Sequence, residues 1–233
     1  MRPVKRGAAP TDAAGNPVVF AEYKDARDPL IKAIGDYCSY CENALHSSID
    51  IEHVQPKKGK AGRPDLELVW DNFLLACDYC NPIKGHQPIV LDDYFWPDRD
   101  NTFQAFMYVA DQPPAPADGL TASDRETACR TLELTGLDRV PGHPHYSDRD
   151  RRFGKRKEAW GVALLALQRY RAPHGISALD VALMAVPRGF FSIWMTVFRE
   201  HPEVRQLLLR EFKAADDCFW PNADPKPRPG GRI

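Results

Sequence analysis

Residues 37–60 read YCSYCENALHSSIDIEHVQPKKGK and begin with a C-x-x-C pair, Cys38 and Cys41. A second pair, Cys77 and Cys80, follows after 35 intervening residues. A C-x-x-C unit places both sulfurs on the same side of a tight turn, so two units supply the four thiolates of a tetrahedral zinc site. The sequence therefore predicts a structural Zn²⁺. Because sulfur takes all four positions, we expect this ion to hold the fold and not to catalyse.

The cysteine pairs have two other interpretations. The four residues could be reduced cysteines packed in a core, or one pair could be a redox C-x-x-C. The redox interpretation is the weaker one, because the pair is duplicated and lies outside a βαβ pattern. Cys129 and Cys218 stand alone in segments with a helical pattern, and we interpret both as buried free cysteines.

The segments around the cysteines predict short elements. Residues 48–54, SIDIEHV, alternate apolar and polar side chains as a strand does, and 70–77, WDNFLLAC, form a second short strand or turn. A helix is expected to open near Cys80, with Pro82 in its first turn, where a missing N–H costs little. A further helix is expected over 22–36, ending at Gly35. Polar residues stand between and around the pairs: Asp50, Glu52, His53, Asn72, Asn81 and Lys84.

These segments resemble the HNH (ββα-metal) nuclease family, in its zinc-stabilised form with two C-x-x-C pairs. The pattern YCxYCE…DIEHxxPK…W-x-N-x-L-x-AC-x-x-CN-x-x-KG is similar, more narrowly, to a bacterial HNH group. That group includes the nuclease component of the Septu anti-phage defence system, which acts with a partner ATPase. The resemblance covers residues 36–86. It implies a metal-dependent endonuclease that cuts DNA, a role in antiviral defence and a partner ATPase.

The resemblance also implies a role for each matching residue. His53 matches the general base that takes a proton from the attacking water, and Glu52 matches the carboxylate ligand of the catalytic divalent ion. Asn72 matches the position whose amide braces the loop that carries the histidine. Asn81 matches the last motif position, where the family name has histidine. An amide oxygen suits a hard ion, so we expect Mg²⁺ or Mn²⁺ to be held by Glu52 and Asn81.

The chemistry of these residue types agrees with that assignment. Phosphodiester hydrolysis needs a base whose pKa is near neutrality, which histidine supplies, and a cation that neutralises the phosphate and the departing oxygen. Neighbouring strand residues point to opposite faces. Glu52 and His53 can therefore share one site only if the strand ends or bulges there, and Pro56 favours an ending.

Two basic segments are candidates for nucleic-acid contact. Lys57, Lys58, Lys60 and Arg63 follow His53 directly and suit a phosphate backbone, and Lys84 is a further candidate. A plain solvated loop is the alternative for the first four. Residues 149–157, RDRRFGKRK, carry six basic side chains against one acidic one, which predicts either a second phosphate strip or a solvated helix start. His143 and His145 suggest metal by their type but lack neighbouring ligands in sequence, and Asp50 is either a solvated strand position or catalytic.

Composition excludes some classes of protein. The 233 residues carry a net charge of −1, so any nucleic-acid binding depends on local patches. No run of about 18 apolar residues is present, and residues 1–15 lack the apolar core of a secretory signal. We therefore expect a cytoplasmic protein with no membrane partner, in which thiols stay reduced.

The predicted fold class is α+β: a small ββα-metal HNH module with a Cys₄ zinc site, followed by a mainly α-helical C-terminal region. The predicted boundaries are a flexible lead-in over 1–21, the module over 22–90, a connecting segment over 91–122, helices over 123–220 and a disordered tail over 221–233. Residues 102–109 are expected to form a strand. Ser123 and Glu126 predict a capping box at the start of a helix that ends near Gly136.

Two other functions compete with the nuclease. A zinc-stabilised nucleic-acid-binding or scaffold module without catalysis is the first, and the presence of Glu52, His53 and Asn81 argues against it. A zinc deaminase is the second. It requires H-x-E followed by P-C-x-x-C with an open zinc position, and this sequence has E-H-V-Q and four cysteines that close the site.

Overall fold

The computed structural model describes residues 1–47 and 49–233. Its ββα unit consists of strands β1 (Asp50–His53) and β2 (Phe73–Ala76), which pair antiparallel, and helix α2 (Cys80–Lys84). In the register, Ile51 lies opposite Leu75 and His53 opposite Phe73. Helix α1 (Arg27–Ile34) packs against β2, whose four residues are all buried. The ββα order and the helical C-terminal half confirm the predicted α+β fold class.

Local sequence signals place the ends of these elements. A short 3₁₀ turn (Tyr23–Ala26) leads into α1, which ends at Gly35 with φ +75°, as the sequence predicted. Only glycine adopts that backbone conformation without strain. Strand β1 ends at His53, just ahead of the predicted proline and lysine loop. The end of β1 is what allows two neighbouring side chains to reach one site.

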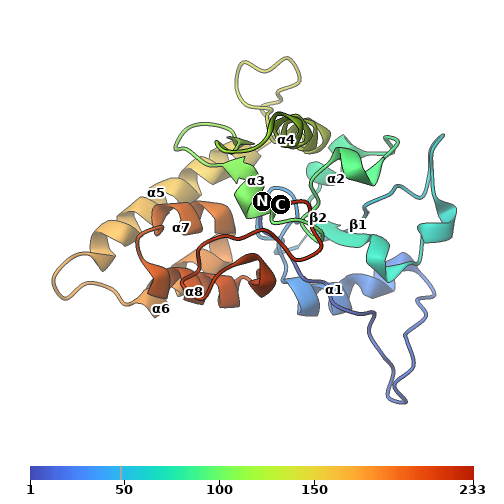
Figure 1. Cartoon of the computed structure of the whole chain (residues 1–233), viewed down its shortest axis with the longest axis horizontal. Helices are drawn as coiled ribbons and strands as arrows, with labels where there is room; N and C mark the ends of the chain where they lie inside the picture. Colours follow the sequence, from blue (N-terminus) through green and yellow to red (C-terminus); the bar gives the residue numbers. More distant parts are fainter. Residues whose placement is uncertain (48) are drawn as a thin grey trace.

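The C-terminal half contains the predicted helices. They are α4 (Ala122–Thr135), α5 (Arg152–Tyr170), α6 (Ala178–Ala185), α7 (Phe191–Val197) and α8 (Pro202–Glu211). Figure 1 shows α5 to α8 gathered on one side of the molecule and β1, β2, α1 and α2 on the other, with α4 above the middle. Helix α7 lies between α5 and α8 and buries five consecutive residues, so its aromatic sequence is core. Among the described residues, no helix combines the length and apolarity needed to cross a membrane.

The connecting segment differs from the prediction. Residues expected to form one strand over 102–109 divide into helix α3 (Thr102–Ala105) and strand β3 (Phe106–Met107), which pairs with β4 (Ala115–Pro116). The Asn101 side chain accepts from two backbone amides at the start of α3, and this cap favours a helical turn. Helix α4 starts with Thr121 as its cap, two residues ahead of the predicted Ser123 cap. Its end at Gly136, φ +61°, agrees with the prediction.

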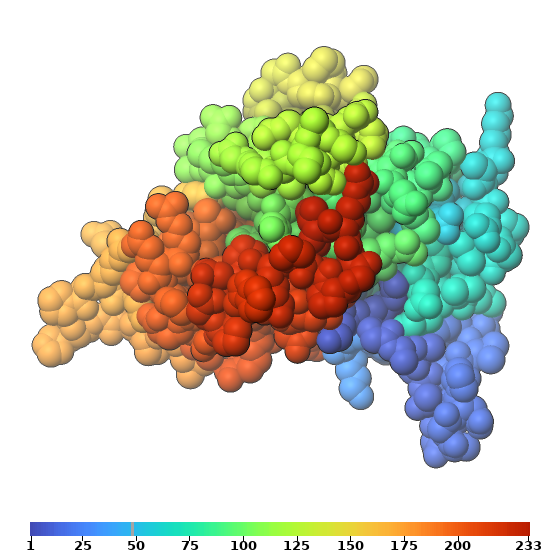
Figure 2. Space-filling model, in the orientation of Figure 1, coloured from blue at the N-terminus to red at the C-terminus, as the bar shows by residue number. Residues whose placement is uncertain are grey.

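The two ends of the chain also differ from the prediction. The expected flexible lead-in is wrong for residues 1–4, which are buried, and the Arg2 guanidinium donates to the carbonyls of Ile34 and Phe212. The expected disordered tail is wrong as well, because the Ile233 carbonyl accepts from the Asn101 amide at 2.9 Å. Figure 2 shows this tail, in red, lying across the middle of the molecule. Arg2 therefore connects the end of α1 to the residue that follows α8, and the C-terminal residue is held at the start of α3.

Candidate active site and metal centre

Four cysteine side chains gather in one buried cluster. The Sγ atoms of Cys38, Cys41, Cys77 and Cys80 all lie within 4.8 Å of one another. The Cys41 and Cys77 sulfurs are 3.7 Å apart, close to the ~3.8 Å spacing of sulfurs at the corners of a tetrahedron with ~2.3 Å Zn–S bonds. The predicted four-cysteine cluster is confirmed, and its geometry fits a zinc ion.

The other two cysteines lie elsewhere. Cys218 is buried, as predicted. Cys129 is exposed on α4, so its prediction as a buried residue is wrong. Thr127, Ala128, Thr131 and Leu132 supply the buried face of that helix, and Cys129 falls on the other side.

A small cavity lies at the end of β1. Its volume is about 160 Å³, and it is lined by Glu52 and His53 from β1 and by Asn81 from α2. The remaining lining residues are Tyr23, Ile51, Pro56, Lys57, Gly85 and His86. Glu52 and His53 alternate along the strand, yet both reach this cavity because the strand stops at His53. Three of the four predicted catalytic residues therefore meet in one hollow.

Hydrogen bonding determines which nitrogen of His53 can act as a base. Its Nε2 lies 3.0 Å from the carbonyl oxygen of Glu67. A carbonyl only accepts, so Nε2 carries the proton and Nδ1 keeps its lone pair. The rings of Tyr23 and Phe73 meet the imidazole edge to face, each with a centroid separation of 5.2 Å. Burial lowers the pKa of His53 below its ordinary value of 6.5, which keeps the ring neutral at pH 7.

Glu52 is held in a buried ion pair. Its Oε1 lies 2.7 Å from the Nζ of Lys84 and accepts from the hydroxyl of Tyr40 at 3.3 Å. Burial raises the pKa of Glu52, and the charge of Lys84 opposes this effect. Lys84 also donates to the carbonyl of His53 at 2.8 Å. The prediction that Lys84 contacts phosphate is wrong: its side chain is only 1% exposed and its ammonium binds the inside of the site.

Asn72 connects the two segments that hold the histidine. Its Oδ1 accepts from the Gln55 amide at 2.8 Å, and its Nδ2 donates to the carbonyls of Gln55 and Leu66 at 2.9 and 3.2 Å. Gln55 lies two residues after His53, and Leu66 lies next to Glu67, whose carbonyl orients the ring. The buried Asn72 side chain thus links the histidine loop to the segment that fixes the histidine tautomer.

Asn81 meets Asp50 at the edge of the cavity. Its Nδ2 donates to Oδ2 of Asp50 at 3.1 Å. A carboxylate only accepts, so this bond turns the amide nitrogen toward Asp50 and leaves Oδ1 for another partner. Asp50 is exposed and is not among the residues that line the cavity, but this bond holds it next to Asn81, which does line it.

The basic loop is only partly available for an external anion. Lys57 binds Glu67 at 2.6 Å and lies over the Tyr23 ring, and Arg63 pairs with Asp65. Lys58 and Lys60 are exposed, and no ion pair is seen for either within the described part of the chain. His86, which was not among the predicted site residues, also lines the cavity. Its place directly after Lys84 and Gly85 is the sequence signal that points to it.

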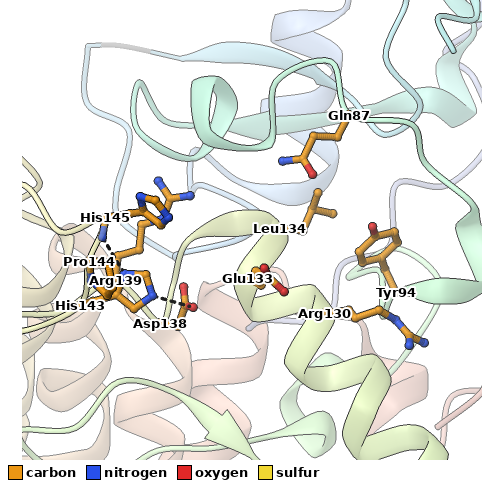
Figure 3. A pocket seen from close by; sticks show the side chains of 10 residues that line it. All are labelled: Gln87, Tyr94, Arg130, Glu133, Leu134, Asp138, Arg139, His143, Pro144 and His145. Atoms are coloured by element: carbon orange, nitrogen blue, oxygen red, sulfur yellow. Dashed lines mark hydrogen bonds and ion pairs between the residues drawn. The ribbon is translucent and has the colours of Figure 1, made fainter. Parts of the chain in front are cut away.

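His143 and His145 lie in a different cavity, of about 480 Å³, beside the end of α4 (Figure 3). The Nε2 of His143 is 3.5 Å from Asp138, and its Nδ1 accepts from the backbone amide of His145. Across residues 1–47 and 49–233, the four cysteines are the one group of three or more metal-ligating side chains that converge.

The second basic segment is not a continuous strip. Arg152 and Arg156 in 149–157 are buried, so neither faces solvent. Lys157 pairs with Asp111 at 2.9 Å. Two of the six basic residues therefore lie in the interior of the protein, which neither a phosphate strip nor a solvated helix start predicts.

Comparison with known proteins supports the nuclease module. Residues 38–87 match the HNH endonuclease family. One relative, the retron Vc95 putative HNH endonuclease of Vibrio cholerae serotype O1 biovar El Tor, is 33% identical over 55 residues. That stretch covers 23% of this chain and 27% of the relative, so about a quarter of the relative's length is matched. An HNH endonuclease domain therefore lies within the predicted module, and likeness to the Septu nuclease in particular stays a prediction.

Proposed function

We propose that this protein is a metal-dependent endonuclease that hydrolyses phosphodiester bonds of DNA. The observation that carries the proposal is the state of His53, whose Nε2 donates to the Glu67 carbonyl, so that Nδ1 keeps the lone pair that can accept a proton, and whose pKa is lowered by burial. Glu52 and Asn81 line the same cavity and offer oxygen atoms of the kind that Mg²⁺ and Mn²⁺ prefer. The HNH match over residues 38–87 supports this assignment.

Each residue has a separate role in the proposed hydrolysis. Nδ1 of His53 takes a proton from water, the water oxygen attacks phosphorus, and the bond from phosphorus to the 3′ oxygen breaks. The 3′ oxygen leaves with the bonding electrons and takes a proton from solvent. A bound divalent ion supplies the positive charge that stabilises the phosphate and the leaving oxygen. Asn72 keeps the imidazole in place, and the exposed Lys58 and Lys60 bind the backbone of the nucleic acid. Lys57 is held by Glu67 and lies at the cavity wall, where its contribution is to position Tyr23 and the loop.

Zinc in the four-cysteine cluster has a structural role in this proposal. Four thiolates leave no coordination position for water. Cys80 and Asn81 are neighbours at the start of α2, so the cluster positions one of the catalytic side chains directly. Zinc loss is therefore expected to disturb the cavity as well as the fold.

We further propose that the nuclease acts in bacterial anti-phage defence, together with a partner ATPase. Support comes from the resemblance of residues 36–86 to the Septu nuclease group, and the name of the Vibrio cholerae relative associates that protein with a retron. Co-purification with the product of a neighbouring ATPase gene would test the partnership. A nuclease gene without a neighbouring ATPase gene would count against it.

A plasmid-nicking assay with Mg²⁺ or Mn²⁺ tests the nuclease proposal against a catalytically silent zinc module. Wild-type protein should nick the plasmid, His53→Ala should lose that activity, and His145→Ala, an exposed histidine in the other cavity, should retain it. Equal activity of wild type and His53→Ala would remove His53 from its role. Absence of nicking in every metal, with zinc bound and the fold intact, would favour the silent module.

A further inference from the structure

Arg152, at the start of α5, reaches the four-cysteine cluster from the helical half of the protein. Its Nη1 lies 3.1 Å from Sγ of Cys80. Its side chain is only 6% exposed, and Cys80 is fully buried. Arg152 lies well outside residues 38–87, the span that matches the nuclease family. The contact therefore joins a cluster thiol to a segment that the motif does not include.

The guanidinium uses all of its donors. Besides Cys80, Nη1 donates to the carbonyl of Thr135 at 2.8 Å, and Nη2 donates to the carbonyl of Gly136 at 2.9 Å. Nε and Nη2 bind the Asp150 carboxylate at 2.7 to 3.0 Å. Five N–H groups in one plane match this set of acceptors, and a lysine ammonium, with three donors on one atom, cannot reach them all. Asp150 and the end of α4 thus fix the direction from which Arg152 approaches the sulfur.

Charge favours the same arrangement. A zinc ion held by four thiolates carries net negative charge, and burying that charge is unfavourable unless a cation compensates it. Arg156 follows Arg152 by one helical turn and is also buried, so the same face of α5 brings a second cation toward the cluster. One of these two arginines makes a direct hydrogen bond to a ligand sulfur.

We propose that Arg152 is a positioning residue of the zinc site, which holds the Cys80 thiolate through an N–H···S bond and retains the metal. This inference rests on the zinc assignment proposed above. It makes the helical half a part of the metal centre, because the residue that completes the site lies on α5. Loss of the bond raises the energy of the thiolate and lets Cys80 leave the metal more readily.

The test measures zinc release from full-length protein to a colorimetric chelator, together with the absorption spectrum of the Co²⁺-substituted protein. Arg152→Met should release zinc about 10-fold to 100-fold faster than wild type, the range typical of residues that support metal ligands. Its sulfur-to-cobalt charge-transfer band should also shift. The zinc-release rate of Arg152→Lys should fall between those of wild type and Arg152→Met. Arg151→Met, a change at an exposed neighbour, should match wild type in both measurements.

A measurement on unaltered protein keeps the inference testable if Arg152→Met does not fold. Wild type loaded with ¹¹³Cd should show scalar coupling between the metal and a guanidinium proton of Arg152. Folded Arg152→Met with the wild-type release rate and cobalt spectrum would overturn the inference, and so would cadmium-loaded protein without that coupling. Wild type that binds no metal would instead overturn the zinc assignment itself.

Discussion

The ammonium of Lys84 lies 2.7 Å from Oε1 of Glu52, and both side chains are almost completely buried. The same ammonium donates to the backbone carbonyl of His53. Lys84 therefore holds two adjacent residues of the proposed catalytic site from inside the protein. Glu52 accepts from Lys84 and Tyr40 through Oε1, so its other oxygen is the one available to the cavity that Glu52 lines.

Replacing Lys84 by methionine should destabilise the protein strongly. Removal of one partner leaves the Glu52 charge buried without compensation, which typically costs about 3–5 kcal/mol. Urea denaturation measures the change, and Lys58→Met, an exposed lysine, should stay within about 0.5 kcal/mol of wild type. Adding Glu52→Gln to Lys84→Met should recover part of the loss. A Lys84→Met protein as stable as Lys58→Met would contradict the importance of this pair.

The nicking rate should depend on pH through His53. Burial lowers the pKa of this histidine below 6.5, and only the neutral ring accepts a proton. The rate should therefore rise with pH through a midpoint below 6.5 and then level off at neutral pH. Initial rates at saturating metal between about pH 5 and 8 give the midpoint. A midpoint clearly above 6.5 would mean that another group limits the reaction.

Asn72→Ala should reduce activity and stability together. It removes three hydrogen bonds and leaves the partly buried backbone groups of Gln55 and Leu66 without their partner, at roughly 1–3 kcal/mol. The His53 loop is then free to shift, and a displacement of about 1 Å can lower a rate by about 100-fold. Nicking rates and thermal melting measure the two effects. Asn72→Asp keeps the acceptor for the Gln55 amide, so its nicking rate and melting temperature should lie between those of wild type and Asn72→Ala. Full activity of Asn72→Ala would exclude the bracing role.

Asn81→Ala should weaken binding of the catalytic ion and leave the zinc in place. The variant loses the amide oxygen that faces away from Asp50. We expect the Mg²⁺ concentration for half-maximal nicking to rise by about 10-fold or more. Asn81→Asp retains an oxygen at this position and is the matched control. If Asn81→Ala requires no more Mg²⁺ than wild type, Asn81 is not a ligand of the ion.

Chelation should distinguish two metal roles. A mild chelator should abolish nicking reversibly, with activity restored by Mg²⁺ alone, while zinc stays bound to the four buried thiolates. Stripping the zinc under forcing conditions should lower the melting temperature and abolish activity in a way that Mg²⁺ does not restore. Elemental analysis and calorimetry follow both steps. Well-folded, active protein that contains no zinc would be incompatible with a structural zinc site.

Much of the site was predictable because its signals are local in sequence. The spacing of Cys38, Cys41, Cys77 and Cys80 predicted a cluster that the structure contains. Glu52 and His53 were expected to share a site if the strand ended, and β1 does end at His53. The predictions failed where a cap or a distant partner decided the structure. Thr121 caps α4 ahead of Ser123, and residues 1–4 and the tail are packed in the interior or against it.

The sequence by itself determined the ββα order, the four-cysteine cluster and the residue types of the cavity, because motif spacing and hydrophobic alternation act over short stretches of chain. Only the tertiary structure decided what the basic residues do. Lys84 and Arg152 resemble surface cations in the sequence, yet one neutralises Glu52 and the other binds Cys80. A charged side chain is buried only where folding brings acceptors to it. For Arg152 the sulfur acceptor lies 72 residues away along the chain, beyond the reach of any local pattern.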